Sequence, residues 1–317
     1  MIDRRGVLVG LLASRPAWGQ PAARPARIGA LLYGGNLQGY DEFVAALREL
    51  GWVDGRNLII EKRFVDDGSQ RGRELAAELQ ALPVALILAS GTTLIRSARD
   101  GAPSTPIVMI NAGDALGSGF IASLRRPGGN LTGTTAAGEE VLTKQLELLS
   151  LAAPRARTIG VLLNRANPAN DFFFNELSAR ARRLGLQVVR VEIDHDAELD
   201  AAVARAKEAP LLVMGDPIFM RHRARIAELS ITHRVPGIFG ARDYVAAGGL
   251  MSYNSSYAWH WRTAAGFVDK ILKGARPGDL PVQQPTQFEL AINLKTAKAM
   301  GLTIPKPLLH LANEVLE

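Results

Sequence analysis

Hydroxyl side chains follow a short apolar run in the first third of this 317-residue sequence. Ser90, Gly91, Thr92 and Thr93 come directly after residues 84–89 and open a predicted helix. Backbone N–H groups at a helix start, together with nearby hydroxyls, favour a carboxylate or another anionic group. We therefore name these four residues as candidate ligand-binding residues. The alternative is that Thr92 or Thr93 only caps its helix.

Charged side chains follow other apolar runs in similar positions. Asp114 and Asp216 can each pair with an amine, and Arg242 can pair with a carboxylate. All three are candidate binding residues. Because Pro217 follows it, Asp216 can equally be a helix N-cap with proline at the first helical position.

Amide and aromatic side chains complete the candidate site. The amide candidates are Asn111, Asn164 and Asn167. An aromatic wall can come from Tyr33, Phe172, Phe173, Phe219 and Tyr253. Aromatic residues near strand ends are often core, so we expect two or three of them to touch a ligand. The aromatic candidates are Tyr33, Phe172, Phe219 and Tyr253.

Motifs for catalysis and for nucleotide or metal binding are absent from the sequence. It contains no Gly-Lys dipeptide, no Gly-x-Gly-x-x-Gly and no Gly-x-Ser-x-Gly. The five histidines are scattered, and His195, between Asp194 and Asp196, fits a solvated turn better than a proton relay. We therefore predict a protein that is not an enzyme and has no catalytic residues, no metal and no cofactor.

The composition is that of a folded chain that can bury a sizeable core, with 47% apolar and 21% charged residues. The net charge is +6, and the first 19 residues contribute three arginines against one aspartate. The charges are spread along the chain without a basic stripe, so we expect no nucleic-acid partner. The absence of cysteine excludes disulfides, thiolate metal sites and a lipidated bacterial N-terminus.

The N-terminus has the pattern of a signal peptide. Arg4 and Arg5 precede the apolar run 7–13, and Ala17 and Gly19 suit a cleavage site before Gln20. The arginine pair is also compatible with a twin-arginine signal. We expect residues 1–19 to be removed, residues 20–26 to be a linker, and the mature protein to be periplasmic and soluble, since no later segment has the length of a membrane span.

Short apolar runs alternate with amphipathic segments from residue 27 onward, a pattern typical of parallel sheets covered by helices on both faces. The predicted strands are 28–32, 58–64, 84–89, 107–110, 159–163, 187–191, 211–214, 237–239, 248–253 and 288–292. The predicted helices include 41–50, 75–82, 197–206, 220–232, 259–273 and 294–300, the last of them capped by Asn293.

An internal repeat is visible in this pattern. Residues 28–32 (Ile-Gly-Ala-Leu-Leu) have a counterpart in residues 159–163 (Ile-Gly-Val-Leu-Leu). Each run is followed by a polar loop and a helix that ends in Leu-Gly, at residues 50–51 and 184–185. The repeat predicts two similar α/β lobes.

The last third of the chain does not begin a third lobe, so we expect the chain to cross between the lobes more than once, as a multi-strand hinge. The predicted division is 27–132 plus 248–284 for the first lobe and 133–247 plus 285–317 for the second. Ligands bind at the carboxyl ends of parallel strands. This rule selects six cleft loops, at residues 33–39, 90–93, 111–117, 164–171, 215–219 and 240–243.

Several segments resemble one family, the substrate-binding proteins of ABC importers of the tryptophan/tyrosine type. They are residues 50–58 (LGWVDGRNL), 123–133 (SLRRPGGNLTG), 144–149 (KQLELL), 248–253, 268–274 (VDKILKG), 280–286 (LPVQQPT) and 301–305 (GLTIP). The resemblance runs from about residue 27 to residue 317. It implies a type I periplasmic-binding-protein fold, α/β, with two Rossmann-like lobes and a three-segment hinge, and a protein that closes on a small ligand and docks on a permease.

The resemblance supports the loops at 91–93, 164–168 and 216–217 as cleft elements. The sequence departs from the family at Ala115-Leu116, at Arg165 and at Asn254, where the family usually has Pro-Val, Pro and Gly. Because these positions lie near the expected cleft, an aromatic amino acid is not the only ligand to consider.

Together these features predict an exported solute-binding protein of an ABC importer. It would capture a small polar or aromatic, amino-acid-like ligand between its lobes and deliver it, as a monomer, to the membrane permease. The alternative is a ligand sensor that docks on a membrane receptor.

Overall fold

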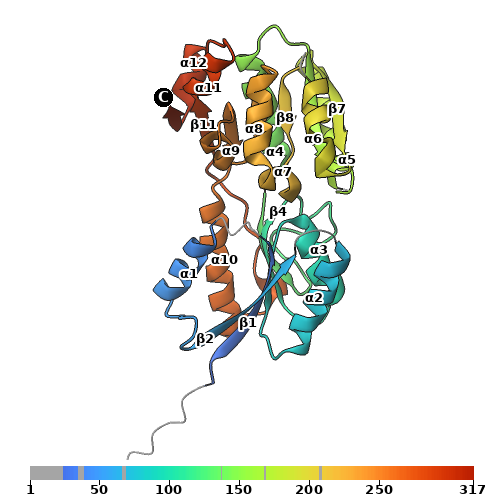
Figure 1. Ribbon diagram of the computed structural model, residues 1–317. Helices are drawn as coiled ribbons and strands as arrows, with labels where there is room; N and C mark the ends of the chain where they lie inside the picture. Colours follow the sequence, from blue (N-terminus) through green and yellow to red (C-terminus); the bar gives the residue numbers. More distant parts are fainter. Residues whose placement is uncertain (1–23, 35–38, 66–68, 137, 168, 207–208) are drawn as a thin grey trace, which may run out of the picture.

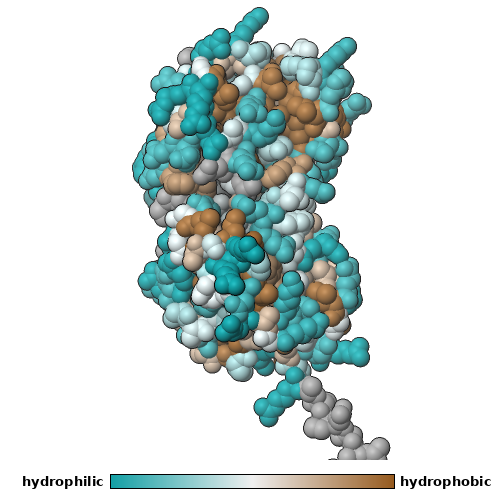
Figure 2. Space-filling model, turned by 180° about the vertical axis from the view of Figure 1, so that it is seen from behind, coloured by the Kyte–Doolittle hydropathy of each residue, from teal (hydrophilic) through white to brown (hydrophobic). Residues whose placement is uncertain are grey.

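The computed structural model describes residues 24–34, 39–65, 69–136, 138–167, 169–206 and 209–317. The predicted signal peptide, residues 1–19, lies outside these residues, as does most of the predicted linker. The described chain forms two lobes stacked end to end (Figure 1). A waist separates the lobes in the space-filling view, and small apolar groups interrupt a largely hydrophilic surface (Figure 2).

The first lobe is built on a five-stranded parallel sheet in the order β2-β1-β3-β4-β5. Its strands are β1 (Ala26–Tyr33), β2 (Leu58–Val65), β3 (Ile87–Ser90), β4 (Ile107–Ala112) and β5 (Leu131–Thr135). Helices α1 (Tyr40–Glu49) and α10 (Tyr257–Leu272) cover one face, and α2 (Ser69–Ala81) and α3 (Thr92–Gly101) cover the other. Strand side chains alternate between the two faces, so each face has its own apolar core.

The second lobe is built on a seven-stranded sheet in the order β12-β11-β10-β9-β8-β6-β7, parallel except for β10 against β11. Its strands are β6 (Thr158–Asn164), β7 (Gln187–Ile193), β8 (Leu211–Val213), β9 (Gly237–Phe239), β10 (Met251–Asn254), β11 (Glu289–Asn293) and β12 (Glu314–Leu316). Its helices are α4 (Gly138–Ala152), α5 (Ala169–Arg183), α6 (Leu199–Arg205), α7 (Pro217–Arg221), α8 (Arg223–Thr232), α9 (Arg242–Ala246), α11 (Leu294–Ala299) and α12 (Lys306–Leu311). Short 3₁₀ turns are η1 (Asp196–Glu198) in the second lobe and η2 (Pro277–Asp279), which packs beside β5 of the first lobe.

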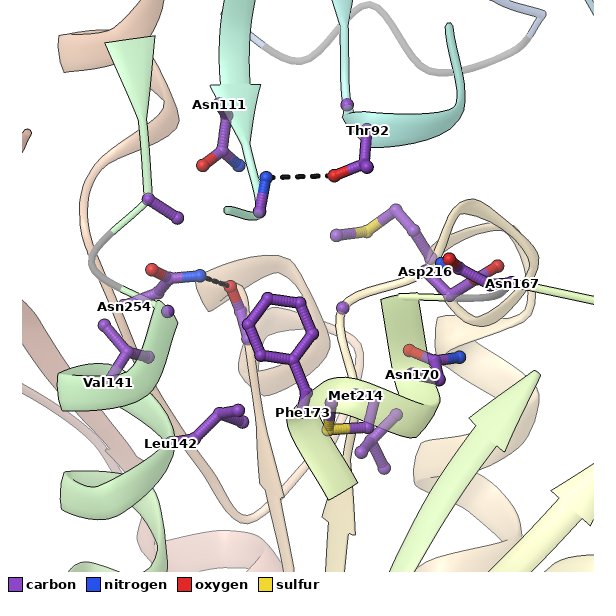
Figure 3. Close-up of a pocket in the computed structure, with 18 of the residues that line it drawn as sticks. Thr92, Asn111, Val141, Leu142, Asn167, Asn170, Phe173, Met214, Asp216 and Asn254 are labelled. Atoms are coloured by element: carbon purple, nitrogen blue, oxygen red, sulfur yellow. Dashed lines mark hydrogen bonds between the residues drawn. The ribbon is translucent and has the colours of Figure 1, made fainter. Parts of the chain in front are cut away.

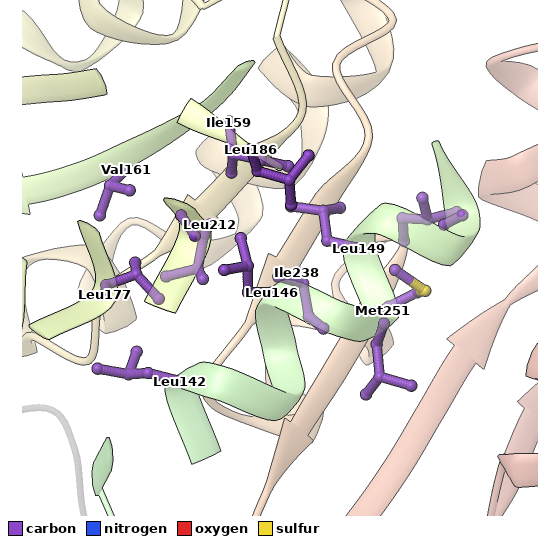
Figure 4. Close-up of a cluster of buried hydrophobic side chains, with 14 of the residues drawn as sticks. Leu142, Leu146, Leu149, Ile159, Val161, Leu177, Leu186, Leu212, Ile238 and Met251 are labelled. Carbon is purple, nitrogen blue, oxygen red and sulfur yellow. The ribbon is translucent and has the colours of Figure 1, made fainter. Parts of the chain in front are cut away.

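Helix α4 forms much of the core beside the cleft. Leu142, Leu146 and Leu149 recur at helical spacing on its buried face and pack towards β6, β8 and β9 (Figure 4). Burying these side chains stabilises the lobe by ~1.5–3 kcal/mol each. This packing fixes the side of α4 that faces the cleft.

The predicted repeat is present as β1-α1-β2 and β6-α5-β7. The helices end just before Gly51 and Gly185, whose φ angles of 91° and 70° lie in the left-handed region that glycine adopts without a Cβ penalty. The predicted cap of α11 is confirmed, since Asn293 Oδ1 accepts a hydrogen bond from Thr296 N at 3.0 Å.

The chain passes between the lobes three times, which confirms the multi-strand hinge. It leaves the first sheet after β5, returns to the first lobe after β10, and crosses again between residues 283 and 289. Gln283 bridges to β5, because Thr135 N donates to Gln283 O at 3.0 Å and Gln283 N donates to Gly133 O at 2.9 Å.

Several details of the predicted organisation differ from the structure. The predicted division places residues 248–284 in the first lobe, but β10 pairs with β9 and β11 in the second sheet. It also ends the first lobe's leading segment at residue 132, but β5 continues to Thr135 in the first sheet. The predicted helix 220–232 is two helices, because the backbone turns at His222, which ends α7 and precedes α8. The sequence analysis does not predict β5, α4, α9, α12 or β12. Among the described residues, no helix combines the length and the apolar character needed to cross a membrane.

Candidate functional site

A pocket of about 190 Å³ lies between the lobes, where the carboxyl ends of strands from both sheets face each other. Figure 3 shows Thr92 and Asn111 on the first-lobe side, opposite Val141, Leu142 and Phe173 of the second lobe. All six predicted cleft loops contribute lining residues. The full lining is Tyr33, Ser90, Gly91, Thr92, Thr93, Asn111, Gly113, Ala136, Gly138, Val141, Leu142, Gln145, Asn167, Asn170, Phe173, Val213, Met214, Gly215, Asp216, Met220, Gly240, Tyr244, Asn254 and Tyr257.

The first-lobe wall is the start of α3. Gly91 occupies the N-cap position and supplies no capping side chain. The first N–H groups of α3 are therefore left to face the pocket. Thr92 Oγ1 instead accepts a hydrogen bond from Gly113 N at 2.9 Å, and the Thr93 side chain bonds the Tyr33 hydroxyl. The alternative that Thr92 or Thr93 only caps α3 is therefore not what the structure shows.

Asp216 supplies the charge of the second-lobe wall. It is the N-cap of α7, with Pro217 following, and it also lines the pocket, so both interpretations of this residue apply. Its oxygens accept hydrogen bonds from Ile218 N at 3.1 Å, Asn164 Nδ2 at 3.2 Å and Asn167 Nδ2 at 2.9 Å.

The carboxylate of Asp216 is buried without a compensating cation. Only 8% of its surface is exposed, and the lining residues include no lysine, arginine or histidine. Burial raises the pKa of Asp216, and the hydrogen bonds from Asn167, Ile218 and Asn164 oppose that rise. In its ionised form, Asp216 gives the pocket a negative charge that a ligand amine can pair with.

Two buried amide oxygens in the lining have no hydrogen-bond partner among the described residues. They are Asn111 Oδ1 in the first lobe and Gln145 Oε1 in the second. The backbone of Asn111 is also in the left-handed region, with φ of 53°. Unpaired buried acceptors are rare in folded proteins and often mark functional sites.

Part of the second-lobe wall is apolar. Val141 and Leu142 come from α4, Met214 follows β8, and Phe173 of α5 projects towards the first lobe (Figure 3). Phe173 reaches the other lobe: a Cβ placed on Gly113 would lie 3.4 Å from its ring. The pocket thus offers a polar wall on one lobe and a mixed wall with one carboxylate on the other.

Eight of the predicted site residues line this pocket. They are Tyr33, Ser90, Gly91, Thr92, Thr93, Asn111, Asn167 and Asp216. The other six lie outside the lining, although Asn164 is adjacent to it because it donates to Asp216.

The remaining five side chains have other surroundings. Asp114 folds back on its own turn, where its Oδ1 accepts from Leu116 N and Gly117 N. Arg242 pairs with Glu314 beside a second pocket of about 300 Å³. Phe172 is 43% exposed, Phe219 is fully buried in the second-lobe core, and Tyr253 stacks on Phe288.

The sequence analysis missed the α4 face and the end of β10. Val141, Leu142 and Gln145 line the pocket from a helix, whereas the strand-end rule selects only loops. Of the departures from the family pattern, Asn254 lines the pocket, Ala115 is core, and Arg165 pairs with Asp194. Among the described residues, no group of three histidine, aspartate or glutamate side chains is placed to hold a metal ion.

Comparison with known proteins gives three similarities. A tyrosine-binding protein of Clostridioides difficile is 26% identical over 262 residues, which cover 82% of this chain and 75% of that protein. The structure of an ABC domain from Streptococcus pneumoniae in complex with L-Trp has a TM-score of 0.84 at 22% identity, over 92% of this chain and all of that one. A conserved domain protein from Vibrio cholerae has a TM-score of 0.86 at 20% identity, with the same coverage.

The two solved structures support the fold, which is that of the periplasmic binding proteins. The sequence profile of the family described as ABC transporter substrate binding protein matches residues 34–316, which is most of the chain. The chain therefore belongs to the family of ABC transporter substrate-binding proteins.

Proposed function

We propose that this protein captures an amino acid between its lobes and delivers it to the permease of an ABC importer. The observation that carries the proposal is one pocket with a buried, uncompensated carboxylate on one lobe and the open start of a helix on the other. A zwitterion complements both. The tyrosine-binding relative and the neighbour in complex with L-Trp support the same ligand class.

In this proposal Asp216 pairs with the ligand ammonium, and the start of α3 with Thr92 and Thr93 binds its carboxylate. The two charged ends of the ligand then contact opposite lobes. Only a closed arrangement satisfies both contacts, so ligand binding shifts the population towards closure about the three-segment hinge. The closed form would be the one that the permease recognises.

The proposal includes the predicted export. Residues 1–19 would direct the chain across the inner membrane and be removed, and the mature protein would act in the periplasm as a monomer. The lobe division would be as predicted, except that β10 belongs to the second lobe and residues 133–135 of β5 belong to the first.

Thermal unfolding of the mature protein tests the ligand class. We expect an amino acid at ~100 times its dissociation constant to stabilise the folded state by about 2.7 kcal/mol and raise the unfolding midpoint. The panel should include aromatic and other amino acids, small aromatic acids, purines and sugars. A shift with sugars or purines and none with any amino acid would contradict the proposal.

A further inference from the structure

The second pocket, of about 300 Å³, lies on the far side of the hinge segment that joins β10 to α10. Asn254 and Tyr257 of this segment belong to the linings of both pockets, so the segment stands between them. The first lobe supplies Gly39, Glu42 and residues 256–258, from the starts of α1 and α10. These helices lie below α9 and β11 of the second lobe in Figure 1, and both of those elements line the pocket from the other side. We call this cavity between the lobes the hinge pocket.

The floor of the hinge pocket is one face of the second sheet. Side chains alternate along a strand, so Ser252 and Asn254 point away from Met251, which packs in the core beside α4. In the ladder between β10 and β11, Ser252 pairs with Ala291, and Asn254 pairs with Glu289. All four paired residues line the hinge pocket. The floor is therefore built by strand pairing and not by a surface loop.

Ser252 carries a polar group that the fold leaves unpaired. The residue is 3% exposed, and its hydroxyl makes no hydrogen bond to any residue that the structure describes. The hydroxyl oxygen itself keeps some exposed surface, since the fully buried side-chain atoms without a partner do not include it. Because Ser252 lines the hinge pocket, that surface opens into it. Buried polar groups are nearly always hydrogen-bonded, so this hydroxyl is a group that a ligand can satisfy.

The hinge pocket is also acidic. Three carboxylates line it, together with one guanidinium, that of Arg242, which Glu314 already binds. Glu42 lies 3.6 Å from Arg262 of its own lobe. Glu289 makes no ion pair and no side-chain hydrogen bond within the described part of the chain. An anion is disfavoured beside these carboxylates, whereas an ammonium group can pair with Glu289.

We propose that the hinge pocket is a second binding site, for a small aliphatic cation that has an ammonium group at one end and another hydrogen-bond donor at the other. The ammonium pairs with Glu289, and the second donor bonds Ser252 Oγ. Glu289 is the diagonal neighbour of Ser252 across the ladder, and such neighbours lie about 7–8 Å apart, which suits a short aliphatic chain. The site does not depend on which ligand occupies the first pocket.

The position of the hinge pocket couples it to lobe closure. Its walls come from both lobes, and the segment 254–257 separates it from the first pocket. A rotation about this segment that opens the first pocket narrows the hinge pocket. In the structure the lobes approach closely across the first pocket, since a Cβ on Gly138 would lie 3.0 Å from Gly113 O. The hinge pocket is thus open when the lobes are together, so a bound cation favours closure and, by linkage, strengthens ligand binding in the first pocket.

Calorimetric titration with putrescine, a four-carbon diamine, tests the site in the absence of any other ligand. The diol of the same length is the neutral control probe, and succinate is the anionic one. We expect putrescine to bind the wild type and neither control probe to bind at the same concentrations. Glu289→Gln should weaken putrescine binding at least tenfold, because the ammonium loses its charged partner, and Ser252→Ala should weaken it about fivefold.

Glu176→Gln is the matched control variant, because it removes a carboxylate of α5 that lines neither pocket. It should bind putrescine as the wild type does. Small-angle scattering should show that saturating putrescine alone makes the wild type more compact. The site is refuted if putrescine does not bind, if the diol binds equally well, or if Glu289→Gln keeps the wild-type affinity; unchanged compaction would refute the coupling to closure. None of these measurements uses an amino acid, so failure of the proposed function is a separate result.

Discussion

At the scale of single residues, Asp216 combines two roles, helix N-cap and pocket residue, that the sequence analysis gives as alternatives. It caps α7 through Ile218 N, and it also places a carboxylate in the pocket, where Asn164 and Asn167 orient it. Removing a carboxylate from water without a counter-charge is costly, and burial raises its pKa accordingly. The three hydrogen bonds lower that cost without cancelling the charge.

Removing the charge of Asp216 should weaken ligand binding and leave the stability of the fold almost unchanged. In Asp216→Asn the side chain can still cap α7, so we expect the free energy of unfolding to change by less than about 1 kcal/mol. The affinity for an amino acid should fall by about 2–5 kcal/mol, at least thirtyfold, because the ammonium loses its buried partner. Calorimetry and thermal unfolding measure the two quantities.

Asp200→Asn is the control for this prediction, since Asp200 pairs with Arg225 on the surface and does not line the pocket. It should bind as the wild type does. Wild-type affinity in Asp216→Asn would show that Asp216 does not pair with the ligand.

At the scale of elements, the sequence was sufficient wherever a pattern is local. Apolar runs and glycine stops gave β1, α1 and β2 and their counterparts in the repeat, because strand burial and helix ends depend on neighbouring residues. The assignment of β10 to the wrong lobe has a different cause. Its partners β9 and β11 lie on either side of it in the chain, and nothing within residues 251–254 specifies which sheet they join.

The same distinction between local and long-range information explains which site residues the sequence predicts correctly. The strand-end rule found all six cleft loops, but it could not tell which side chain of a loop turns inwards. Asp114 has the right chemistry but accepts hydrogen bonds from its own turn, and Arg242 pairs with the distant Glu314. Gln145 lies mid-helix in a run of leucines, and only the packing of α4 on its sheet shows that this position faces the pocket.

Helix α10 connects two of the three hinge segments through one buried histidine. His260 Nδ1 lies 2.9 Å from Thr134 Oγ1 in β5, and its Nε2 lies 2.9 Å from Ser255 Oγ just after β10. The Thr134 hydroxyl also accepts from Asn111 N at 3.0 Å, which links the histidine to the pocket. A neutral ring suits this position, and burial lowers the pKa of His260 to about 4.

This histidine should make folding stability depend on pH. An unfolded histidine takes up a proton near pH 6.5, whereas folded His260 resists protonation down to about pH 4, so acid favours the unfolded chain in that window. The stability is fully present above about pH 6.5, and we expect about 2 kcal/mol of it to be lost between pH 7 and pH 5. Urea unfolding at the two pH values measures the loss.

A variant comparison isolates the contribution of His260 from those of other titrating groups. His260→Asn should show a smaller loss between the two pH values, while His310→Asn, at an exposed site in α12, should keep the wild-type dependence. The assignment is wrong if the wild type and His260→Asn lose the same stability.

At the scale of the whole molecule, contacts across the cleft set how far the lobes can close. Gly138 at the start of α4 faces the backbone of the first-lobe loop after β4, and a Cβ there would lie 3.0 Å from both Gly113 O and the Phe173 ring. The ring can rotate, but the backbone oxygen can move away only if the lobes move apart. Closure therefore depends on a small residue at this point.

Gly138→Ala should hold the lobes slightly apart and lower the apparent affinity for the ligand about tenfold, because fewer molecules reach the closed state. The unliganded protein should be as stable as the wild type, since alanine is favoured over glycine within a helix.

Gly215→Ala is the control: Gly215 lines the same pocket, but a Cβ there would meet nothing within 4 Å. Small-angle scattering with and without saturating ligand should show less compaction in Gly138→Ala than in Gly215→Ala. Equal compaction and equal affinity in the two variants would show that this contact does not limit closure.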